Sequence, residues 1–144
     1  MKESIGADMG TTEWFLIDQD RINAFADCTE DHQFIHVDPE NAAKTPFGST
    51  IAHGFLSLSM LSYFAASVGC VFENMLMGIN YGFDKVRFLA PVKVNKRVRA
   101  RARLLDVQEK KPGHFLIKQE VTIEIEGETT PALIAEWLTM AITK

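Results

Sequence analysis

Cysteine and basic residues are scarce in this 144-residue chain. The two cysteines, Cys28 and Cys70, form neither a CxxC pair nor a metal-ligand spacing, which favours free thiols in a reducing compartment such as the cytoplasm. Lysine and arginine total 15 against 19 aspartates and glutamates, so the formal net charge is -4. Because phosphate contacts need a basic excess, this balance argues against a general nucleic-acid-binding protein.

The chain also lacks the signature motifs of several enzyme classes. GxGxxG, GxxxxGK[ST] and GxSxG are all absent, which argues against the simplest nucleotide-dependent enzymes and serine hydrolases. The first ten residues contain no basic region followed by an apolar core, so we expect no secretory signal. No repeat, low-complexity run or linker divides the sequence, and residues 1–144 are predicted to form one domain.

Residues 54–72 contain no charged side chain and are long enough to cross a bilayer. The segment nevertheless holds four serines, begins next to His53 and has no flanking basic cluster. These features favour a helix buried inside a water-soluble domain, and we expect no membrane partner.

Local patterns predict the elements of the first half. Residues 11–18 are rich in aromatic and β-forming types and predict a strand. Asp18 is expected to cap a helix over residues 19–29, and Asp38 a short helix that begins at Pro39. Residues 51–70 predict one long helix, with apolar residues at steps of three and four: Phe55, Leu58, Leu61, Phe64 and Val68.

The second half predicts an antiparallel sheet. Three runs are expected to be strands: residues 81–105, broken near Pro91 and Asn95, residues 113–126, and residues 131–142. The turn sequence EKKPGH between the first two predicts a hairpin. Arginines at alternate positions 97–103 could bind phosphate, but we favour cross-strand pairing with the glutamates of residues 120–126.

These elements predict an α+β fold in which a long central helix packs on an antiparallel sheet. Such a sheet leaves strand edges uncovered, so we expect the chain to form a dimer.

The stretch TEDHQFIHVDP (residues 29–39) holds two of the four histidines and is the candidate site. Asp31 and His36 are five residues apart, so turning backbone can bring both side chains to one water molecule. Alternatively, Asp31 caps a turn and His36 is a half-buried structural histidine. The apolar pair Phe34 and Ile35 is expected to hold the segment against the core.

A second candidate feature is the start of the long helix, IAHGF. The free backbone N–H of Gly54 could stabilise a negative oxygen there, while His53 is expected to be first-turn structure or a pocket wall. We expect His32 and His114 to be surface or turn residues. A metal site formed by His32, His36 and Asp38 is disfavoured, because no third neutral ligand follows at a suitable spacing.

Two segments resemble a known family. FADCTEDHQFIHVDPENAAKTPFGSTIAHGFLSLSMLS (residues 25–62) resembles the hydratase motif of MaoC-like dehydratases, which include R-specific enoyl-CoA hydratases and a nodulation-protein-N-like group. Residues 81–107 resemble the family's strand region. Glu30 stands where glycine is common, and Gln33-Phe34 replace Asn-Pro, so the chain lies near the nodulation-type branch.

The resemblance implies a hot-dog fold, usually dimeric. It also implies that Asp31 and His36 position one water, which adds across the 2,3 double bond of an acyl thioester. Gly54 would be the backbone oxyanion donor, and Ser62 matches a serine on the central helix near the family's site. Phe34 and His53 are further candidates for the substrate pocket.

The leading hypothesis is therefore a hydro-lyase of fatty acid metabolism that acts on acyl-CoA or acyl-carrier thioesters without a cofactor or metal. A hot-dog acyl-CoA thioesterase is one alternative, although residues 42–71 offer no acidic residue for its helix. A non-catalytic module that binds acyl thioesters is the other.

Overall fold

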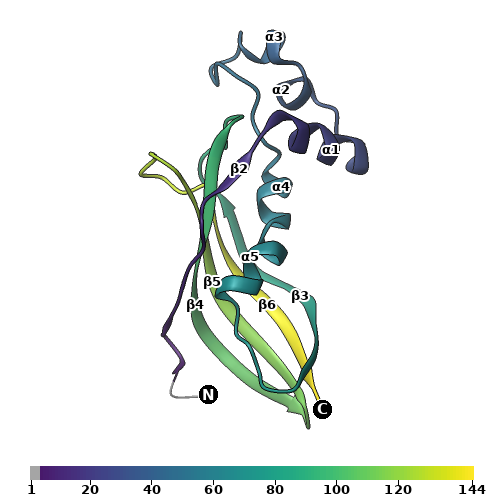
Figure 1. Cartoon of the computed structure of the whole chain (residues 1–144), viewed down its shortest axis with the longest axis vertical. Coiled ribbons are helices and arrows are strands. Elements are labelled where there is room, and N and C mark those ends of the chain that lie inside the picture. Colours follow the sequence, from purple (N-terminus) through teal and green to yellow (C-terminus); the bar gives the residue numbers. More distant parts are fainter. Residues whose placement is uncertain (1–3) are drawn as a thin grey trace.

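A curved antiparallel sheet packs against a helical rod formed by α4 and α5 in the computed structural model, which describes residues 4–144 (Figure 1). Residues 1–3, which begin the stretch examined for a secretory signal, lie outside this range. The strand order is β1-β4-β5-β6-β3, and β2 also pairs with β4. The α+β prediction is confirmed. The strands are β1 (Asp8–Thr11), β2 (Phe15–Ile17), β3 (Met75–Phe88), β4 (Lys96–Lys111), β5 (His114–Ile125) and β6 (Leu133–Thr143).

Three helices gather at one end of the molecule, and two form the rod along the sheet (Figure 1). The first group comprises α1 (Gln19–Thr29), α2 (Phe34–Val37) and α3 (Pro39–Ala42). As predicted, Asp18 caps α1 by accepting a hydrogen bond from the Arg21 amide at 2.9 Å. Asp38 caps α3, whose first residue is Pro39, as predicted.

The predicted long helix is divided into α4 (Gly54–Ser59) and α5 (Leu61–Val68). Met60 joins them with helical dihedral angles, and its amide donates to the Leu56 carbonyl, so the rod bends without ending. Leu61, Phe64 and Val68 are buried as predicted. Phe55, which belongs to the same apolar pattern, is instead 68% exposed, and its ring contacts that of Phe88 at the surface. No helix within residues 4–144 has the length and apolarity that a membrane-spanning helix needs.

The sheet confirms the alternation predicted for β4 and β5, which form the expected hairpin. Arg99 bonds Glu124 at 2.7 Å and Arg103 bonds Glu120 at 3.2 Å on the outer face. The inner face carries the core, where β5 contributes Ile117, Val121, Ile123 and Ile125. The arginine row therefore pairs with glutamates, as we favoured.

The N-terminal strand prediction was wrong in its extent, because the chain forms two short strands on either side of residues 12–14. Thr12 interrupts them: its amide donates to the Ala100 carbonyl, and its hydroxyl accepts from the Ala100 amide at 3.0 Å. The Thr12 hydroxyl oxygen thus takes the place of a backbone carbonyl in the hydrogen bonds between this segment and β4.

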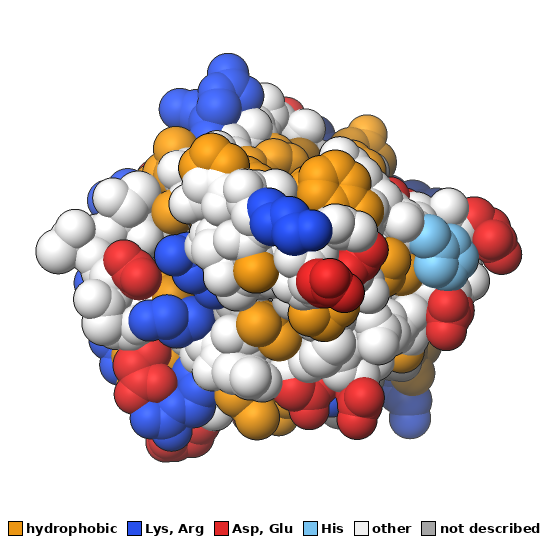
Figure 2. All heavy atoms as spheres, turned by 90° about the horizontal axis from the view of Figure 1, so that it is seen from above, with side chains coloured by type: hydrophobic (Ala, Val, Ile, Leu, Met, Phe, Trp, Pro, Cys, Tyr) orange, Lys and Arg blue, Asp and Glu red, His pale blue; other side chains and the backbone are white. Residues whose placement is uncertain are grey.

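Strand β3 lies at an edge of the sheet and is almost wholly exposed. Its exposed large apolar side chains are Met75, Leu76, Met77, Ile79, Tyr81, Phe83 and Phe88. Exposed edge strands of this kind are templates for pairing with another chain. By contrast, the end of the molecule seen in Figure 2 intermixes acidic, basic and hydrophobic side chains.

Candidate functional site

Asp31 and His36 lie on the connection between α1 and the single turn α2. α1 ends at Glu30, which adopts a left-handed conformation with φ 63° and turns the chain toward the site. The following turn points His36 inward, where it is 7% exposed. The expected burial of Phe34 was wrong: it is 46% exposed, because residues two apart on a helical turn lie on opposite sides.

Backbone contacts fix the ring of His36. Its Nδ1 lies 2.7 Å from the Ile51 carbonyl oxygen, and a carbonyl can only accept. Nδ1 therefore carries the hydrogen, and in the neutral ring Nε2 is left with a lone pair. The Ile51 amide in turn donates to the Ile35 carbonyl at 3.0 Å, which ties α2 to the segment before α4.

Burial lowers the pKa of His36 from its usual 6.5, and repulsion from His53 adds to the decrease. The hydrogen bond to Ile51 and the charge of Asp31 act in the opposite direction but do not reverse it. His36 is consequently neutral near pH 7 and can accept a proton.

His53 contacts both candidate residues. Its ring stacks on that of His36 with centroids 3.8 Å apart, and its other side lies against Phe25 at 4.9 Å. Its Nε2 lies 2.9 Å from the backbone oxygen of Asp31, which makes Nε2 the donor. The Nδ1 atom is buried and has no hydrogen-bond partner within the described part of the chain. His53 thus lies at the N-cap of α4 and contacts both candidate residues.

One carboxylate oxygen of Asp31 and one ring nitrogen each of His36 and His53 lie within 4.8 Å of one another. Two hydrogen bonds of about 2.8 Å that meet at one water oxygen separate their outer atoms by about 4.6 Å. The spacing therefore fits a shared water. It fits a metal ion poorly, because the two rings are only 22° from parallel and a metal lies in the plane of each imidazole that binds it.

The metal-ligand set considered from the sequence is not brought together. His32 lies on the surface, where it bonds Asp27 at 2.8 Å, and Asp38 is occupied as the cap of α3. The position of His32 agrees with the surface location predicted for it, and His114 is likewise close to solvent, bonding the Pro112 carbonyl.

A cavity of about 300 Å³ borders this cluster, and its walls include His36, Gly54, Ser57 and Phe88. Gly54 begins α4, so its N–H has no partner inside the helix. A Cβ at Gly54 would lie 3.0 Å from two carbons of the Phe88 ring, so glycine permits this close wall. The carboxylate of Asp31 is 52% exposed and lies at the outer side of the cluster.

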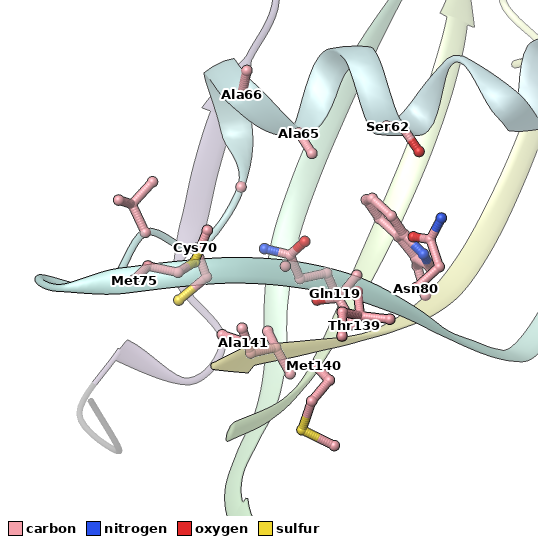
Figure 3. A pocket seen from close by; sticks show the side chains of 16 residues that line it. Ser62, Ala65, Ala66, Cys70, Met75, Asn80, Gln119, Thr139, Met140 and Ala141 are labelled. Atoms are coloured by element: carbon pink, nitrogen blue, oxygen red, sulfur yellow. The ribbon is translucent and has the colours of Figure 1, made fainter. Parts of the chain in front are cut away.

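Ser62, which the family resemblance placed near the site, does not line the cavity beside His36, and Ser57 does. Ser57 is 3% exposed and lines the cavity beside His36, whereas Ser62 lines a second cavity farther along the rod (Figure 3). Sequence reasoning therefore missed Ser57. Its only signal was a position one turn after His53.

Sequence reasoning also missed the support beneath α2. The Thr50 hydroxyl donates to Gln19 Oε1 at 2.6 Å, and Gln19 Nε2 donates to the backbone oxygen of His36 at 2.8 Å. This relay links α1, α2 and the segment before α4. Nothing in the local sequence marks Gln19, because its role depends on contacts 17 and 31 residues away.

Comparisons with known proteins identify the family and the fold of the chain. The family model described as MaoC-like domain matches residues 1–128. Nodulation protein N of Rhizobium meliloti is 49% identical over 138 residues, which cover 95% of this chain and 86% of that protein. 3-hydroxyacyl-thioester dehydratase Z of Mycobacterium tuberculosis is 46% identical over 131 residues, covering 91% and 86%.

A solved structure, the (R)-hydratase from A. caviae involved in PHA biosynthesis, aligns with a TM-score of 0.77 at 25% identity and covers 94% of each chain. The hot-dog fold implied by the sequence resemblance is thereby confirmed. With the family model matching most of its length, and relatives nearly half identical over more than nine tenths of it, the chain belongs to the MaoC-like dehydratase family.

Proposed function

We propose that the protein is a hydro-lyase that reversibly adds water across the 2,3 double bond of an enoyl thioester, forming a 3-hydroxyacyl thioester. The observation that carries this proposal is the spacing of Asp31 and His36 beside the cavity that Gly54 lines. The dehydratase from Mycobacterium tuberculosis and the (R)-hydratase from A. caviae support the reaction class by their names. By analogy we propose the (R)-3-hydroxyacyl thioester as product.

In the proposed mechanism one water donates its hydrogens to Asp31 and to His36 Nε2. The Nδ1–H bond to Ile51 keeps the lone pair on Nε2, so His36 is the base. As the water oxygen bonds C3, its proton passes to Nε2, and the imidazolium then returns that proton to C2. Water thus supplies both the hydroxyl and the hydrogen, and both residues end in their starting state.

The thioester oxygen becomes negative as C3 is attacked. We propose that the Gly54 N–H donates to it, since a free amide at a helix start is directed at incoming negative charge. The Phe88 ring lies close beside this position and forms one wall of the proposed oxygen site.

We further infer a homodimer that forms through β3. The strand offers a row of unpaired backbone groups and seven exposed large apolar side chains, and a second copy presents the same surface. Tyr81→Lys, on β3, should convert the dimer to a monomer in sedimentation or light-scattering measurements. Leu16→Lys, which alters an exposed apolar residue of β2, should not. A wild-type monomer at micromolar concentration would disprove the inference.

The activity is tested with crotonyl-CoA and longer enoyl-CoA esters by following the loss of enoyl absorbance. Asp31→Asn and His36→Ala should each lower kcat by about 10²–10⁴-fold, the usual contribution of acid–base groups. His32→Ala, which removes a surface histidine, is the matched control and should leave kcat unchanged. Full turnover in both site variants would disprove the assignment.

The same samples test the alternatives. Release of free CoA thiol from saturated acyl-CoA would favour a thioesterase, although α4 and α5 carry no acidic residue. Saturable binding of acyl-CoA without turnover of any enoyl ester would favour a binding module.

A further inference from the structure

The turn that carries His36 is too short to fix the position of this residue alone. α2 is a single turn of four residues, and its N-cap residue, Gln33, makes no side-chain capping bond. Helices of this length are unstable in water by themselves, so contacts with other segments must hold the turn. The carbonyl group of His36 lies near the end of the turn, where helical carbonyls have no partner inside the helix. It therefore needs a donor from another segment.

Gln19 supplies that donor from the first turn of α1. Its Nε2 donates to the backbone oxygen of His36 at 2.8 Å and to Asn23 Oδ1 at 2.9 Å, while its Oε1 accepts from the Thr50 hydroxyl at 2.6 Å. Both N–H groups and the oxygen of the amide are thus used. The glutamine also has a firm base, because α1 is capped by the side chain of Asp18.

These bonds form a closed cycle of contacts around His36. Its Nδ1 donates to the Ile51 carbonyl at 2.7 Å. The residue before Ile51 is Thr50, whose hydroxyl returns to Gln19. This segment is itself fixed, since the Thr50 carbonyl accepts from the Val94 amide at 3.0 Å. One glutamine therefore ties the short turn α2 to two fixed parts of the molecule, α1 and the segment before α4.

We propose that Gln19 is a positioning residue of the hydratase site: by fixing the backbone of His36, it keeps Nδ1–H on the Ile51 carbonyl and the lone pair on Nε2. This inference rests on the proposed function. A shift of His36 by about 1 Å away from Ile51 would lengthen the 2.7 Å bond to about 3.7 Å, which is beyond hydrogen-bonding range. The imidazole is then free to carry its hydrogen on Nε2, and in that form Nε2 cannot accept a proton from water.

Gln19 also has a structural task, which the test must separate from positioning. The Thr50 hydroxyl is buried, with 1% of the residue exposed, and would lose its acceptor in Gln19→Met. That variant should therefore melt at a lower temperature. Adding Thr50→Val removes the orphaned hydroxyl and should restore most of the Tm. In this double variant stability returns, while the His36 carbonyl still lacks its donor.

The test measures Tm, and kcat and KM for crotonyl-CoA hydration, on the same preparations. Gln19→Met and the double variant should both lower kcat by at least about 10-fold, because a misplaced base slows the chemical step. KM should stay within about twofold of the wild-type value, since neither Gln19 nor Thr50 lines the cavity beside His36. Gln108→Met, which removes an exposed glutamine of β4 and its surface hydrogen bonds, is the matched control and should change none of the three quantities.

A second readout follows the tautomer of His36 directly. At a pH where the imidazole is neutral, ¹⁵N NMR distinguishes the nitrogen that carries the hydrogen from the one that does not, and His36→Gln assigns the signals. The wild type and Gln108→Met should show the hydrogen on Nδ1. Gln19→Met and the double variant should show a mixture with the Nε2–H form.

A kcat that returns to the wild-type value together with Tm in the double variant would overturn the inference and leave Gln19 a purely structural residue. An Nδ1–H tautomer that is unchanged in both variants would overturn it as well. If the wild type turns over no enoyl ester, the proposed function fails instead, and the tautomer alone decides the positioning role. A mixture found only in the variants that lack Gln19 would then support it.

Discussion

Replacing His53 by phenylalanine tests whether this residue positions Asp31. Phenylalanine keeps a flat ring against His36 and Phe25 but removes both nitrogens. The backbone oxygen of Asp31 then loses its 2.9 Å bond to Nε2, so residue 31 is no longer held at the distance from His36 that suits a shared water.

The expected change in the free energy of unfolding is small. Losing one hydrogen bond costs about 0.5–1.5 kcal/mol, and removing the buried, unpartnered Nδ1 returns about 1–3 kcal/mol. The balance runs from a loss of about 0.5 kcal/mol to a gain of about 2.5 kcal/mol, centred on a gain of about 1 kcal/mol or about 3 °C in Tm. Activity should respond differently, because a misplacement of about 1 Å in a reacting group costs about 10²-fold in rate.

The measurements are Tm by circular dichroism and kcat/KM for crotonyl-CoA hydration on the same preparation. We expect an unchanged or slightly raised Tm together with a fall in kcat of about 100-fold. His32→Phe is the matched control, since that histidine is exposed and should tolerate the change in both assays. Wild-type kcat in His53→Phe would refute the positioning role, and a large loss of Tm would refute the assumption that phenylalanine preserves the stack.

Three further predictions concern pH, the cavity wall and the turn before the site. Because burial lowers the pKa of His36, kcat/KM should fall on the acid side with a midpoint below pH 6.5. As pH falls through 6.5, His36 is protonated in the unfolded chain before it is protonated in the folded one, so the free energy of unfolding measured in urea should decrease. His36→Gln should remove this pH-dependent part of the stability. Gly54→Ala should lower kcat about 10-fold or more, since its Cβ meets the Phe88 ring at 3.0 Å, and adding Phe88→Leu should restore part of the rate. Glu30→Gly should raise the free energy of unfolding by about 1 kcal/mol and Tm by about 3 °C with unchanged kcat/KM, because φ is 63° there, and Glu30→Ala should give no gain.

The parts of the fold predicted from the sequence are those decided by local rules. Asp18 and Asp38 act as caps because a side-chain oxygen beside a free helical amide needs no distant partner. The predicted interruption of the strand run near Pro91 and Asn95 is also decided locally. Asn95 adopts a left-handed conformation with φ 66°, and β4 begins at the next residue. The β4–β5 hairpin required only strict alternation and a turn between two runs.

The site was predicted less completely, because its geometry depends on distant contacts. The family resemblance indicated Asp31 and His36, but periodicity in four residues is too weak to reveal that α2 is a helical turn, so Phe34 was placed inward. The stack of His53 on His36 joins residues 17 positions apart, and no spacing rule encodes it. Ser57 and Ser62 look alike in sequence, and the bend at Met60 and the course of the sheet decide which cavity each one lines.

Gln119 is a polar residue in an otherwise apolar row, and the sequence alone could not show what that means. Its place in an apolar row was visible, and polar residues on inward faces are common wherever a strand end reaches water. Its significance depends on two facts of the structure: the side chain is buried, and Nε2 has no hydrogen-bond partner among the described residues. Neither the burial nor the missing partner could be read from the sequence, because both depend on the side chains of Leu104 and Trp137, which lie opposite Gln119 on the two neighbouring strands.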